Sequence, residues 1–455
     1  MESIASTTGR KREIDFTHGD PLKLILSFYW PLLLTSGLQQ FYNFADTWIV
    51  GKGLGDNALA AVGNMSSLFF LIVGFSFGLA SGFGILVAHS FGAKDYEELR
   101  HRLAAIIELG ILLSIFLSVV SVAFLPHALR LLRTDERIIG DSLLYGYIVF
   151  GGLSTGICYN IAGAVLRSLG DSRTPLVAIV LSSVLNLSLN WLFIMTFHMG
   201  VEGAAIATIC SQVVSAFICI RRLTQIPMIR LGREDFRNDG RVFAELLKNG
   251  LPMALMNSIT AIGCMVVQYF VNGYGVLYTA AYTACSKYLN LFMTPAATAG
   301  NAMSAYTSQN YGAKEYGRIR DGLRVGLGIS VVSYLVFGSL MVFAPAALAG
   351  FLLTGSEPIA LAVRFLPRCG VMLICVDCLF VIRSCVQGMG KPMLPMVSGI
   401  LEMFLRIAVI SFFIGRIGYP ATAYAEIAAW IGALAVNAYA FRRELLPRLT
   451  VMPAH

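Results

Sequence analysis

Long apolar runs alternate with short polar segments along the whole chain. About 20 apolar residues suffice to cross a bilayer as a helix, and on that basis the sequence predicts twelve transmembrane helices. The first six lie near residues 22–50, 59–89, 103–125, 139–166, 175–197 and 201–221. The second six lie near residues 248–272, 279–309, 323–351, 359–387, 393–415 and 421–441.

The two halves of the sequence repeat each other. The segment Phe91–Arg100 matches Tyr311–Arg320 at five of ten positions, at an offset of 220. Further pairs keep nearly the same offset and order: Pro31 with Pro252, Gly170 with Gly390, and Pro175 with Pro395. Because six helices is an even number, both halves insert in the same direction, and an axis along the membrane normal is expected to relate them.

The predicted fold class is an all-α integral membrane protein. Its twelve transmembrane helices form two pseudo-twofold-related six-helix bundles around a central cleft, which is an architecture suited to alternating access. We place an N-lobe at residues 1–222 and a C-lobe at residues 248–455. The polar, arginine-rich stretch 223–247 between them is the predicted cytoplasmic linker.

Composition excludes the soluble classes of protein. Hydrophobic residues make up 56% of the chain and charged residues 13%, about half the charged fraction of a soluble domain. The nine cysteines are odd in number and lie in apolar stretches, which argues against a secreted disulfide framework.

The positions of lysine and arginine predict the orientation. If the N-terminus is cytoplasmic, that side receives 24 of the 34 Lys and Arg residues and the opposite loops receive 7. The positive-inside rule then predicts a multi-pass protein of the inner cell membrane with both termini in the cytoplasm. The same bias explains the net charge of +8, so no nucleic-acid partner is expected.

Three predicted helices of the N-lobe each carry a stripe of polar side chains on one face. Polar groups are expensive inside a membrane, and several stripes in one bundle can meet in a common cavity. The alternative is that the Asn and Thr side chains only hold neighbouring helices together by hydrogen bonds. The stripes are Gln39, Asn43 and Asp46; Ser182, Asn186 and Asn190; and Thr208, Ser211 or Gln212, and Ser215.

Asp46 is the candidate coupling residue. No Lys or Arg lies in the middle of the first, second, fifth or sixth predicted helix, so this carboxylate is expected either to hold a proton or to recruit a cation. Together with Asn186, Asn190 and Thr208 it offers hard oxygen ligands that suit H⁺ or Na⁺. Gln39, Asn43 and Gln212 are the supporting polar residues, and no other metal or cofactor is predicted.

The C-lobe carries a different set of charges inside its helices. Glu402 and Arg406 are four residues apart and can neutralise each other, and the repeat offset places Arg406 where the N-lobe has Asn186. We therefore expect a paired charge network in the C-lobe, which is either functional or structural. Its members are Lys287, Asp377, Arg383, Glu402 and Arg406.

Several motifs together resemble those of the multidrug and toxic compound extrusion (MATE) family of cation-coupled exporters, over about residues 20–445. They are Phe44-Ala-Asp46-Thr-Trp-Ile-Val-Gly51, Ala58-Leu-Ala-Ala-Val-Gly63, Phe91-Gly-Ala-Lys94, Leu166-Arg-Ser-Leu-Gly-Asp-Ser-Arg-Thr-Pro175 and Gly200-Val-Glu-Gly-Ala-Ala-Ile-Ala-Thr208. The resemblance implies two bundles of six helices and export of amphiphilic, often cationic compounds in exchange for H⁺ or Na⁺.

The resemblance also implies roles for individual residues. In one branch of the family the N-lobe site uses residues that Asp46, Asn186 and Thr208 match, whereas Asn190 stands where that branch has a second Asp. Another branch uses an Asp on the tenth helix, which Asp377 matches, together with a Glu on the seventh. This chain has no acidic residue between Asn249 and Ala313.

The favoured interpretation is therefore a monomeric secondary antiporter in the lipid bilayer, whose partner is a small amphiphilic organic substrate. A lipid-linked sugar flippase of the related superfamily is the alternative within transport. A polytopic membrane enzyme is the alternative from another class, although the sequence contains no HExxH, GxSxG or phosphate-binding loop.

Overall fold

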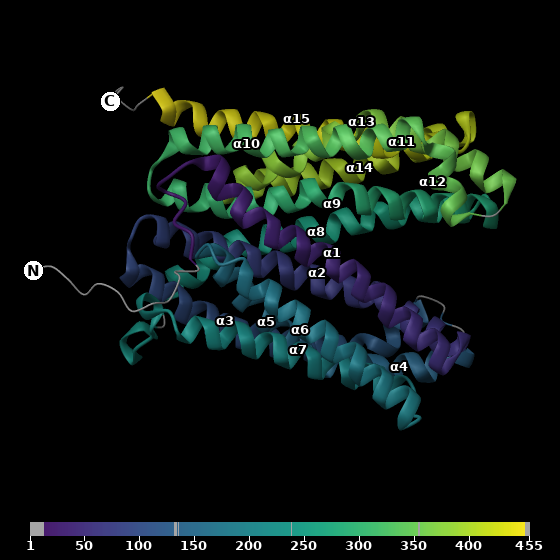
Figure 1. Ribbon diagram of the computed structural model, residues 1–455, viewed down its shortest axis with the longest axis horizontal. Helices are drawn as coiled ribbons and strands as arrows, with labels where there is room; N and C mark the ends of the chain where they lie inside the picture. Colours follow the sequence, from purple (N-terminus) through teal and green to yellow (C-terminus); the bar gives the residue numbers. More distant parts are fainter. Residues whose placement is uncertain (1–12, 132–133, 135, 238, 354, 451–455) are drawn as a thin grey trace, which may run out of the picture.

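The structure is a computed structural model that describes residues 13–131, 134, 136–237, 239–353 and 355–450, and these residues form helices and no strand. Two groups of helices lie one above the other (Figure 1). The group that we call the N-lobe contains α2 (Asp56–Gly92), α3 (Tyr96–Leu131), α4 (Glu136–Gly151), α5 (Leu153–Ser168), α6 (Arg173–Asn190), the π-helical turn η1 (Trp191–Thr196) and α7 (Val201–Thr224). The C-lobe contains α9 (Val276–Gly312), α10 (Tyr316–Ser333), the π-helical turn η4 (Tyr334–Gly338), α11 (Ser339–Phe343), α12 (Pro345–Leu352), α13 (Ser356–Gly388), α14 (Met393–Ile417) and α15 (Pro420–Thr450).

The helices confirm a multi-pass membrane protein. Among the described residues, nine helices are long and apolar enough to cross a bilayer, and α4 with α5, bent by 45° at their junction, make a tenth candidate span. Two more helices, α9 with 37 residues and α15 with 31, have sufficient length but are not among these candidates. The count of twelve spans therefore stays a prediction.

The internal repeat is confirmed in the backbone. Helices α2 and α9 each contain 37 residues, and their first residues, Asp56 and Val276, keep the offset of 220. Four pairs of residues with positive φ keep it as well: Gly55 (85°) with Gly275 (102°), Lys94 (58°) with Lys314 (64°), Gly170 (84°) with Gly390 (71°), and His198 (52°) with Gly418 (66°). The same unusual backbone conformation thus recurs at equivalent turns of the two halves.

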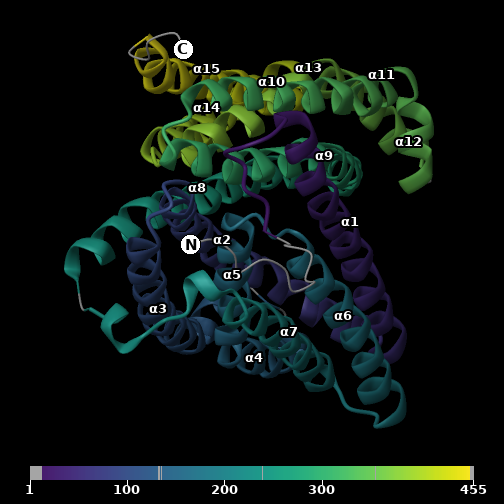
Figure 2. The same ribbon diagram turned by 60° about the vertical axis from the view of Figure 1, so that its left-hand side comes forward.

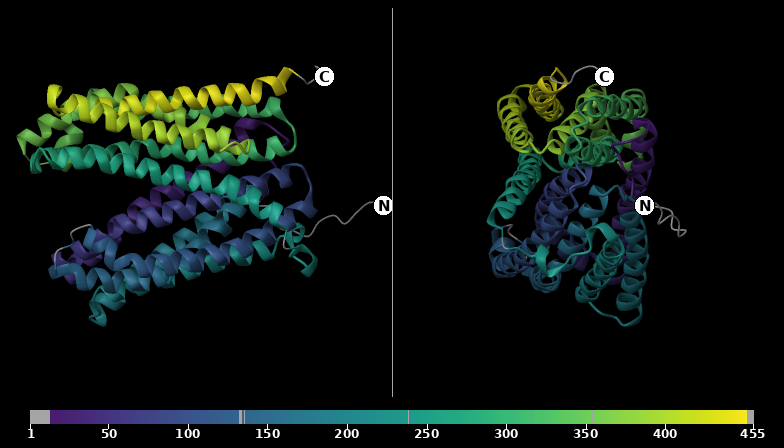
Figure 3. Two further views of the ribbon diagram at one scale, coloured as in Figure 1. Left: turned by 180° about the vertical axis from the view of Figure 1, so that it is seen from behind. Right: turned by 90° about the vertical axis from the view of Figure 1, so that its left-hand side faces the viewer.

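Two long helices, α1 (Pro21–Leu54) and α8 (Gly240–Asn272), run between the lobes on opposite sides of the molecule (Figure 3). The first half of α1 packs on the C-lobe through Phe28 and Leu32, and its second half packs on the N-lobe through Ile49 and Val50. Helix α8 does the reverse. Its first half packs on the N-lobe, and its second half packs on the C-lobe. Each lobe is therefore completed by a helix that also contacts the other lobe.

The lobes meet at one end, which we call the junction end, where α2 and α9 finish (Figure 1). A Cβ atom added at Gly92 would lie 1.9 Å from the carbonyl oxygen of Gln309, and one added at Gly312 would lie 2.0 Å from that of His89. Neither distance is possible for a real Cβ atom, so the close approach of α2 and α9 at each of these two positions requires glycine. We call these two positions the glycine crossings. The other end, where α1 finishes at Leu54, is the distal end.

Two equivalent hydrogen bonds connect the lobes at the junction end. The His89 Nε2 atom of the N-lobe lies 2.8 Å from the carbonyl oxygen of Gly388 in the C-lobe. The Gln309 side-chain amide of the C-lobe donates to the carbonyl oxygen of Ser168 in the N-lobe, also at 2.8 Å. The repeat offset relates the two contacts, so the pseudo-twofold axis passes between them.

The N-terminal segment 13–20 lies across the junction end. Phe16 is fully buried, its amide donates to Gln309 Oε1 at 2.9 Å, and its carbonyl accepts from Arg318 at 2.9 Å. Glu13 pairs with Arg222 of the N-lobe at 2.5 Å. Burial acts to raise the pKa of Asp15, but hydrogen bonds from Thr17 leave it below its ordinary value. The segment therefore ties both lobes together.

The connection between the lobes, which includes the 3₁₀ turns η2 (Pro227–Ile229) and η3 (Arg233–Asp235), lies against α3 (Figure 2). Ile226 and Ile229 are buried in the N-lobe core. The nearly buried carboxylate of Asp235 pairs with Arg100 at 3.3 Å. The described part of the predicted linker is thus fixed to the N-lobe.

Candidate functional site

A chain of hydrogen bonds connects Asp46 to the inside of the N-lobe. Asp46 lies in the second half of α1, and one of its carboxylate oxygens accepts from the side-chain amide of Asn190 on α6. The same amide donates to Asn186 Oδ1 at 2.8 Å, and Asn186 donates to Ser211 Oγ of α7 at 3.3 Å. Asn186 and Asn190 are fully buried, so three helices contribute to one buried polar site.

Local structure explains why the two asparagines lie together. Asn186 and Asn190 are four residues apart, which places them one above the other on the same face of α6. Asn190 is the last α-helical residue before η1, and π-helical turns of this kind frequently occur at functional sites. The Oδ1 atom of Asn190 is buried without a hydrogen-bond partner among the described residues, and it stays available as an oxygen ligand.

Two tyrosines complete the surroundings of Asp46. Tyr42 of α1 and Tyr145 of α4 both lie close to the Asp46 carboxylate and to the Thr208 hydroxyl of α7. Thr208 also donates to the carbonyl oxygen of Ala204 within its own helix, at 3.0 Å. The two tyrosines thus belong to the surroundings of both Asp46 and Thr208.

Two of the supporting residues predicted around Asp46, Gln39 and Gln212, have no hydrogen bond to Asp46 among the described contacts. Gln39 is exposed on α1 and has no described hydrogen bond to the site. Gln212 of α7 accepts from the Thr155 hydroxyl of α5 at 3.0 Å. The side chain of Asn43 lies outside the part of the chain that the structure describes.

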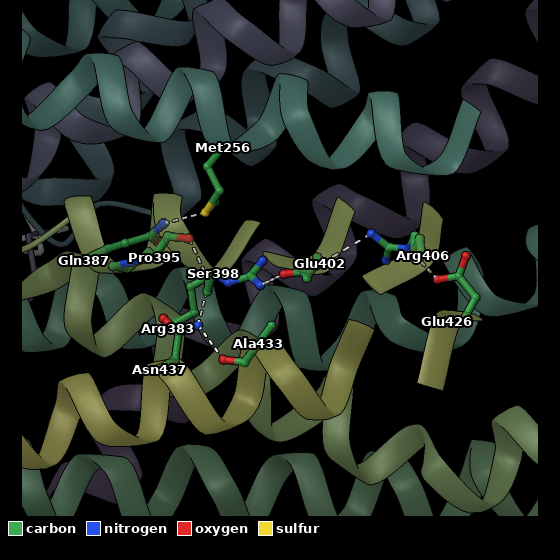
Figure 4. Close-up of polar contacts among 10 residues, drawn as sticks. All are labelled: Met256, Arg383, Gln387, Pro395, Ser398, Glu402, Arg406, Glu426, Ala433 and Asn437. Carbon is green, nitrogen blue, oxygen red and sulfur yellow. Dashed lines mark hydrogen bonds and ion pairs between the residues drawn. The ribbon is translucent and has the colours of Figure 1, made fainter. Parts of the chain in front are cut away.

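A buried row of four charged side chains crosses the C-lobe (Figure 4). Arg383 of α13 donates to Glu402 of α14. Arg406 lies 3.6 Å from Glu402 on one side and 3.0 Å from Glu426 of α15 on the other. The four residues are between 3% and 7% exposed. Two cations and two anions cancel in this row, so the network is neutral and holds three helices together.

Neutral hydrogen bonds extend the same layer of the C-lobe (Figure 4). The Asn437 amide of α15 donates to Ser398 Oγ of α14 at 2.8 Å, and Ser398 donates to the carbonyl oxygen of Pro395 at 2.7 Å. The Gln387 amide approaches the Met256 sulfur of α8 at 3.5 Å. This layer therefore links α8, α13, α14 and α15.

Two residues predicted for the charge network do not join it. Asp377 is fully buried on α13, and neither of its carboxylate oxygens has a hydrogen-bond partner among the described residues. Lys287 is exposed on α9 and makes no ion pair within the described part of the chain. The physical reason is helix rotation, because Arg383, Glu402 and Arg406 point into the space between α13, α14 and α15, whereas Lys287 points away from it.

Sequence reasoning missed three residues of these sites. Glu426 was detectable, because it is an isolated acid inside the predicted twelfth helix, where a charge needs a partner. Tyr42 and Tyr145 carried no comparable signal, since tyrosine is common in membrane helices. Within the described residues, no group of three His, Cys, Asp or Glu side chains is arranged to hold a metal ion.

Comparison with known proteins decides the family. The family model MatE matches the chain twice, over residues 31–192 and 252–412, which again reflects the internal repeat. The chain belongs to the MATE family. It is 30% identical to the probable multidrug resistance protein YoeA of Bacillus subtilis (strain 168) over 351 residues, which cover 74% of this chain and 75% of YoeA.

Two further comparisons agree with the MATE assignment. The probable multidrug resistance protein YpnP of Bacillus subtilis (strain 168) is 29% identical over 92% of this chain and 91% of its own length. The crystal structure of MATE in the bent conformation superposes with a TM-score of 0.90 at 21% identity, covering 98% of this chain and 99% of that chain. The second similarity shows that the fold is shared.

Membership of the MATE family makes this chain a multidrug-efflux-type membrane transporter that acts on small organic compounds, and not an enzyme. The enzyme alternative is thereby removed. Transporters of this family use coupling ions.

Proposed function

We propose that this MATE transporter is a secondary antiporter that exports amphiphilic organic compounds in exchange for a cation bound at Asp46. The observation that carries the proposal is that Asp46 contacts buried Asn190 and makes no ion pair among the described residues. A carboxylate in such a place needs a positive partner, and a mobile ion can supply it.

The donors around Asp46 favour a proton over Na⁺. Sodium needs several oxygen ligands, whereas one Asp46 oxygen already accepts a hydrogen bond from Asn190 and the site offers a single carboxylate. The unpartnered Asn190 Oδ1 can accept a hydrogen bond from a protonated Asp46. Na⁺ coordination by Asp46, Asn190 Oδ1 and Thr208 is the competing possibility.

The position of Asp46 on α1 supports a link between ion binding and access. The second half of α1 carries Asp46 and packs on the N-lobe, while its first half packs on the C-lobe. A change of charge at Asp46 alters the contact of α1 with α6, and α1 transmits this change to the interface between the lobes. Such a two-state element is what coupling between ion and substrate requires.

The junction end is rich in basic residues, including Arg100, Arg102, Arg222 and Arg318, which supports its assignment to the cytoplasmic side. In this proposal the protein lies in the inner cell membrane as a monomer, with both termini cytoplasmic. The glycine crossings at Gly92 and Gly312 then close the cytoplasmic side, and the described state faces outward.

Transport by purified protein in liposomes tests the proposal. Uptake of a fluorescent amphiphilic compound is measured with a pH gradient and a Na⁺ gradient imposed separately, for the wild-type protein and for Asp46→Asn. We expect the pH gradient to drive uptake by the wild type and at least tenfold less by Asp46→Asn. Equal uptake by the two proteins, or uptake that neither gradient changes, would contradict antiport through Asp46. Uptake driven by Na⁺ alone would assign Na⁺ as the coupling ion.

A further inference from the structure

Helical periodicity assigns Lys287 to the face of α9 that contacts α1 and α2 further along the helix. Thr298 and Gly312 follow it by about three and about seven helical turns, which places both within about 20° of Lys287 around the helix. The Thr298 hydroxyl lies 3.4 Å from that of Ser36 on α1, and Gly312 crosses α2 at the junction end. The same face of α9 therefore contacts α1 and the N-lobe below Lys287, and Lys287 continues it toward the distal end.

Lys287 lines an open pocket of about 240 Å³ between α9 and the end of α12. Lys287 is the one charged residue of its lining, and the remaining lining residues are small or apolar. They are Ala280, Thr283, Ala284, Leu352 and Leu353. A pocket with one cation and an otherwise mostly apolar wall is complementary to an amphiphilic anion.

The charge of Lys287 has no ion-pair partner among the described residues. Arg383 and Arg406, the other basic residues that sequence analysis placed inside C-lobe helices, are paired with Glu402 and Glu426. Lys287 is exposed and makes no ion pair with a described residue. A lysine that lies within a long helix and has no ion-pair partner among the described residues is a candidate for binding a charged ligand.

Lys287 and Asp46 lie at comparable depths from the distal end. Lys287 follows Val276, the first residue of α9, and Asp46 precedes Leu54, the last residue of α1. The helical rise converts these two separations to about 16 Å and about 12 Å. The C-lobe thus presents a cation at a level similar to that of the N-lobe carboxylate.

We propose that Lys287 binds the anionic group of an amphiphile, whose apolar part contacts Ala280, Ala284 and Leu352. This deepens the proposed function, on which its transport role rests, because it adds organic anions and zwitterions to the compounds that the protein exports. The same carboxylate or phosphate chemistry is present in an exported organic anion and in the headgroup of an anionic phospholipid. The experiment must distinguish these two sources.

Binding measured without an ion gradient tests the pocket independently of antiport. A fluorescent amphiphilic carboxylate and an amine of matched size and apolar part are titrated against full-length protein in phosphatidylcholine nanodiscs. We expect Lys287→Gln to weaken binding of the carboxylate at least tenfold and to leave binding of the amine within twofold. Lys287→Arg restores carboxylate binding, since it keeps the charge. Lys248→Gln, which removes an exposed lysine near the start of α8, serves as the matched control.

Two arms identify the source of the anion. Addition of phosphatidylglycerol to the nanodiscs displaces the carboxylate in a Lys287-dependent manner if the ligand is a lipid headgroup, and leaves it bound if the ligand is an exported anion. Both results support the pocket. The inference is overturned if Lys287→Gln binds both probes like the wild type or loses both probes equally. It is also overturned if the wild type does not bind the carboxylate. If binding depends on Lys287 as expected but no ion gradient drives transport, the proposed antiport is contradicted and the Lys287 pocket is not.

Discussion

Asn190 donates its side-chain amide to the carboxylate of Asp46, and this contact joins α1 to α6 inside the N-lobe. Asn190 is fully buried, so the carboxylate is held by a neutral donor in place of a permanent cation. A neutral donor stabilises the ionised carboxylate without discharging it. In the proposed antiport, this arrangement leaves the charge of Asp46 free to change.

Replacement of Asn190 by Ala tests this contact. The substitution removes the donor to Asp46 and the donor to Asn186, and a hydrogen bond to a charged group contributes about 1.5 to 3 kcal/mol. We expect ion-driven uptake to fall at least tenfold while the protein remains folded. Ser188→Ala, on the exposed face of α6, is the control and should transport like the wild type. Unchanged uptake by Asn190→Ala would show that the contact has no part in coupling.

Replacement of Glu402 by Gln tests whether the C-lobe network is structural. The substitution leaves Arg383 without its anionic partner and Arg406 with Glu426 alone. Loss of one partner from a buried pair costs about 3 to 5 kcal/mol, so the melting temperature in detergent should fall clearly. Uptake per folded molecule should stay within about twofold. The double variant Arg383→Met with Glu402→Gln restores neutrality and should recover most of the stability. A network that drives transport would instead lose uptake in both variants.

The glycine crossings at the junction end predict how access is controlled. Alanine at Gly92 or Gly312 places a Cβ atom about 2 Å from a backbone oxygen of the other lobe. Overpacking of this kind costs about 1 to 3 kcal/mol, which corresponds to a shift of an equilibrium by about 5- to 150-fold. Hydrogen–deuterium exchange of residues 305–313 should therefore become faster in both variants.

The control for the glycine variants is Gly328→Ala, because a Cβ atom there meets no atom within 4 Å. Alanine is the better helix former, so this variant should be as stable as the wild type or slightly more stable. Equal exchange rates in Gly92→Ala, Gly312→Ala and Gly328→Ala would contradict the role of the crossings.

The buried ring of Phe16 predicts that the N-terminal segment stabilises the closed junction. Its centroid lies 5.3 Å from that of Phe28 and 5.6 Å from that of Tyr306. Replacement of a buried Phe by Ala costs about 3 to 5 kcal/mol of stability. This cost destabilises the state in which the N-terminal segment is bound at the junction end. We expect faster exchange of the amides of residues 13–20 in Phe16→Ala. The control Phe116→Ala, at an exposed position, should exchange like the wild type. Exchange in Phe16→Ala as slow as in this control would refute the prediction.

Much of the fold was predictable because it depends on local pattern. The length of apolar runs predicted the helices, and the matched segments near residues 91 and 311 predicted the repeat that Lys94 and Lys314 confirm in the backbone. The packing of α1 and α8 on both lobes was not predictable, because hydropathy describes how apolar a helix is and not which neighbour it contacts. The predicted lobe boundaries at residues 222 and 248 stay predictions for the same reason.

The two candidate sites differ in how well the sequence described them. Asp46, Asn186 and Asn190 could be placed together because spacing of four residues defines a helix face. In the C-lobe the same rule paired Glu402 with Arg406 but could not reveal Glu426, which reaches Arg406 from another helix. Lys287 was assigned to the network because it is a charge in the same lobe, although its face of α9 points elsewhere.

Proton release on substrate binding tests the role of Asp46 most directly. Purified protein in weakly buffered nanodiscs is mixed with a fluorescent amphiphilic compound that it transports, and a pH indicator records the protons released for each compound bound. Proton exchange at Asp46 predicts that the wild type releases about one proton and that Asp46→Asn binds the compound without release. Equal release by the two proteins, or binding by the wild type that releases no proton at any pH, would contradict exchange of a proton at Asp46.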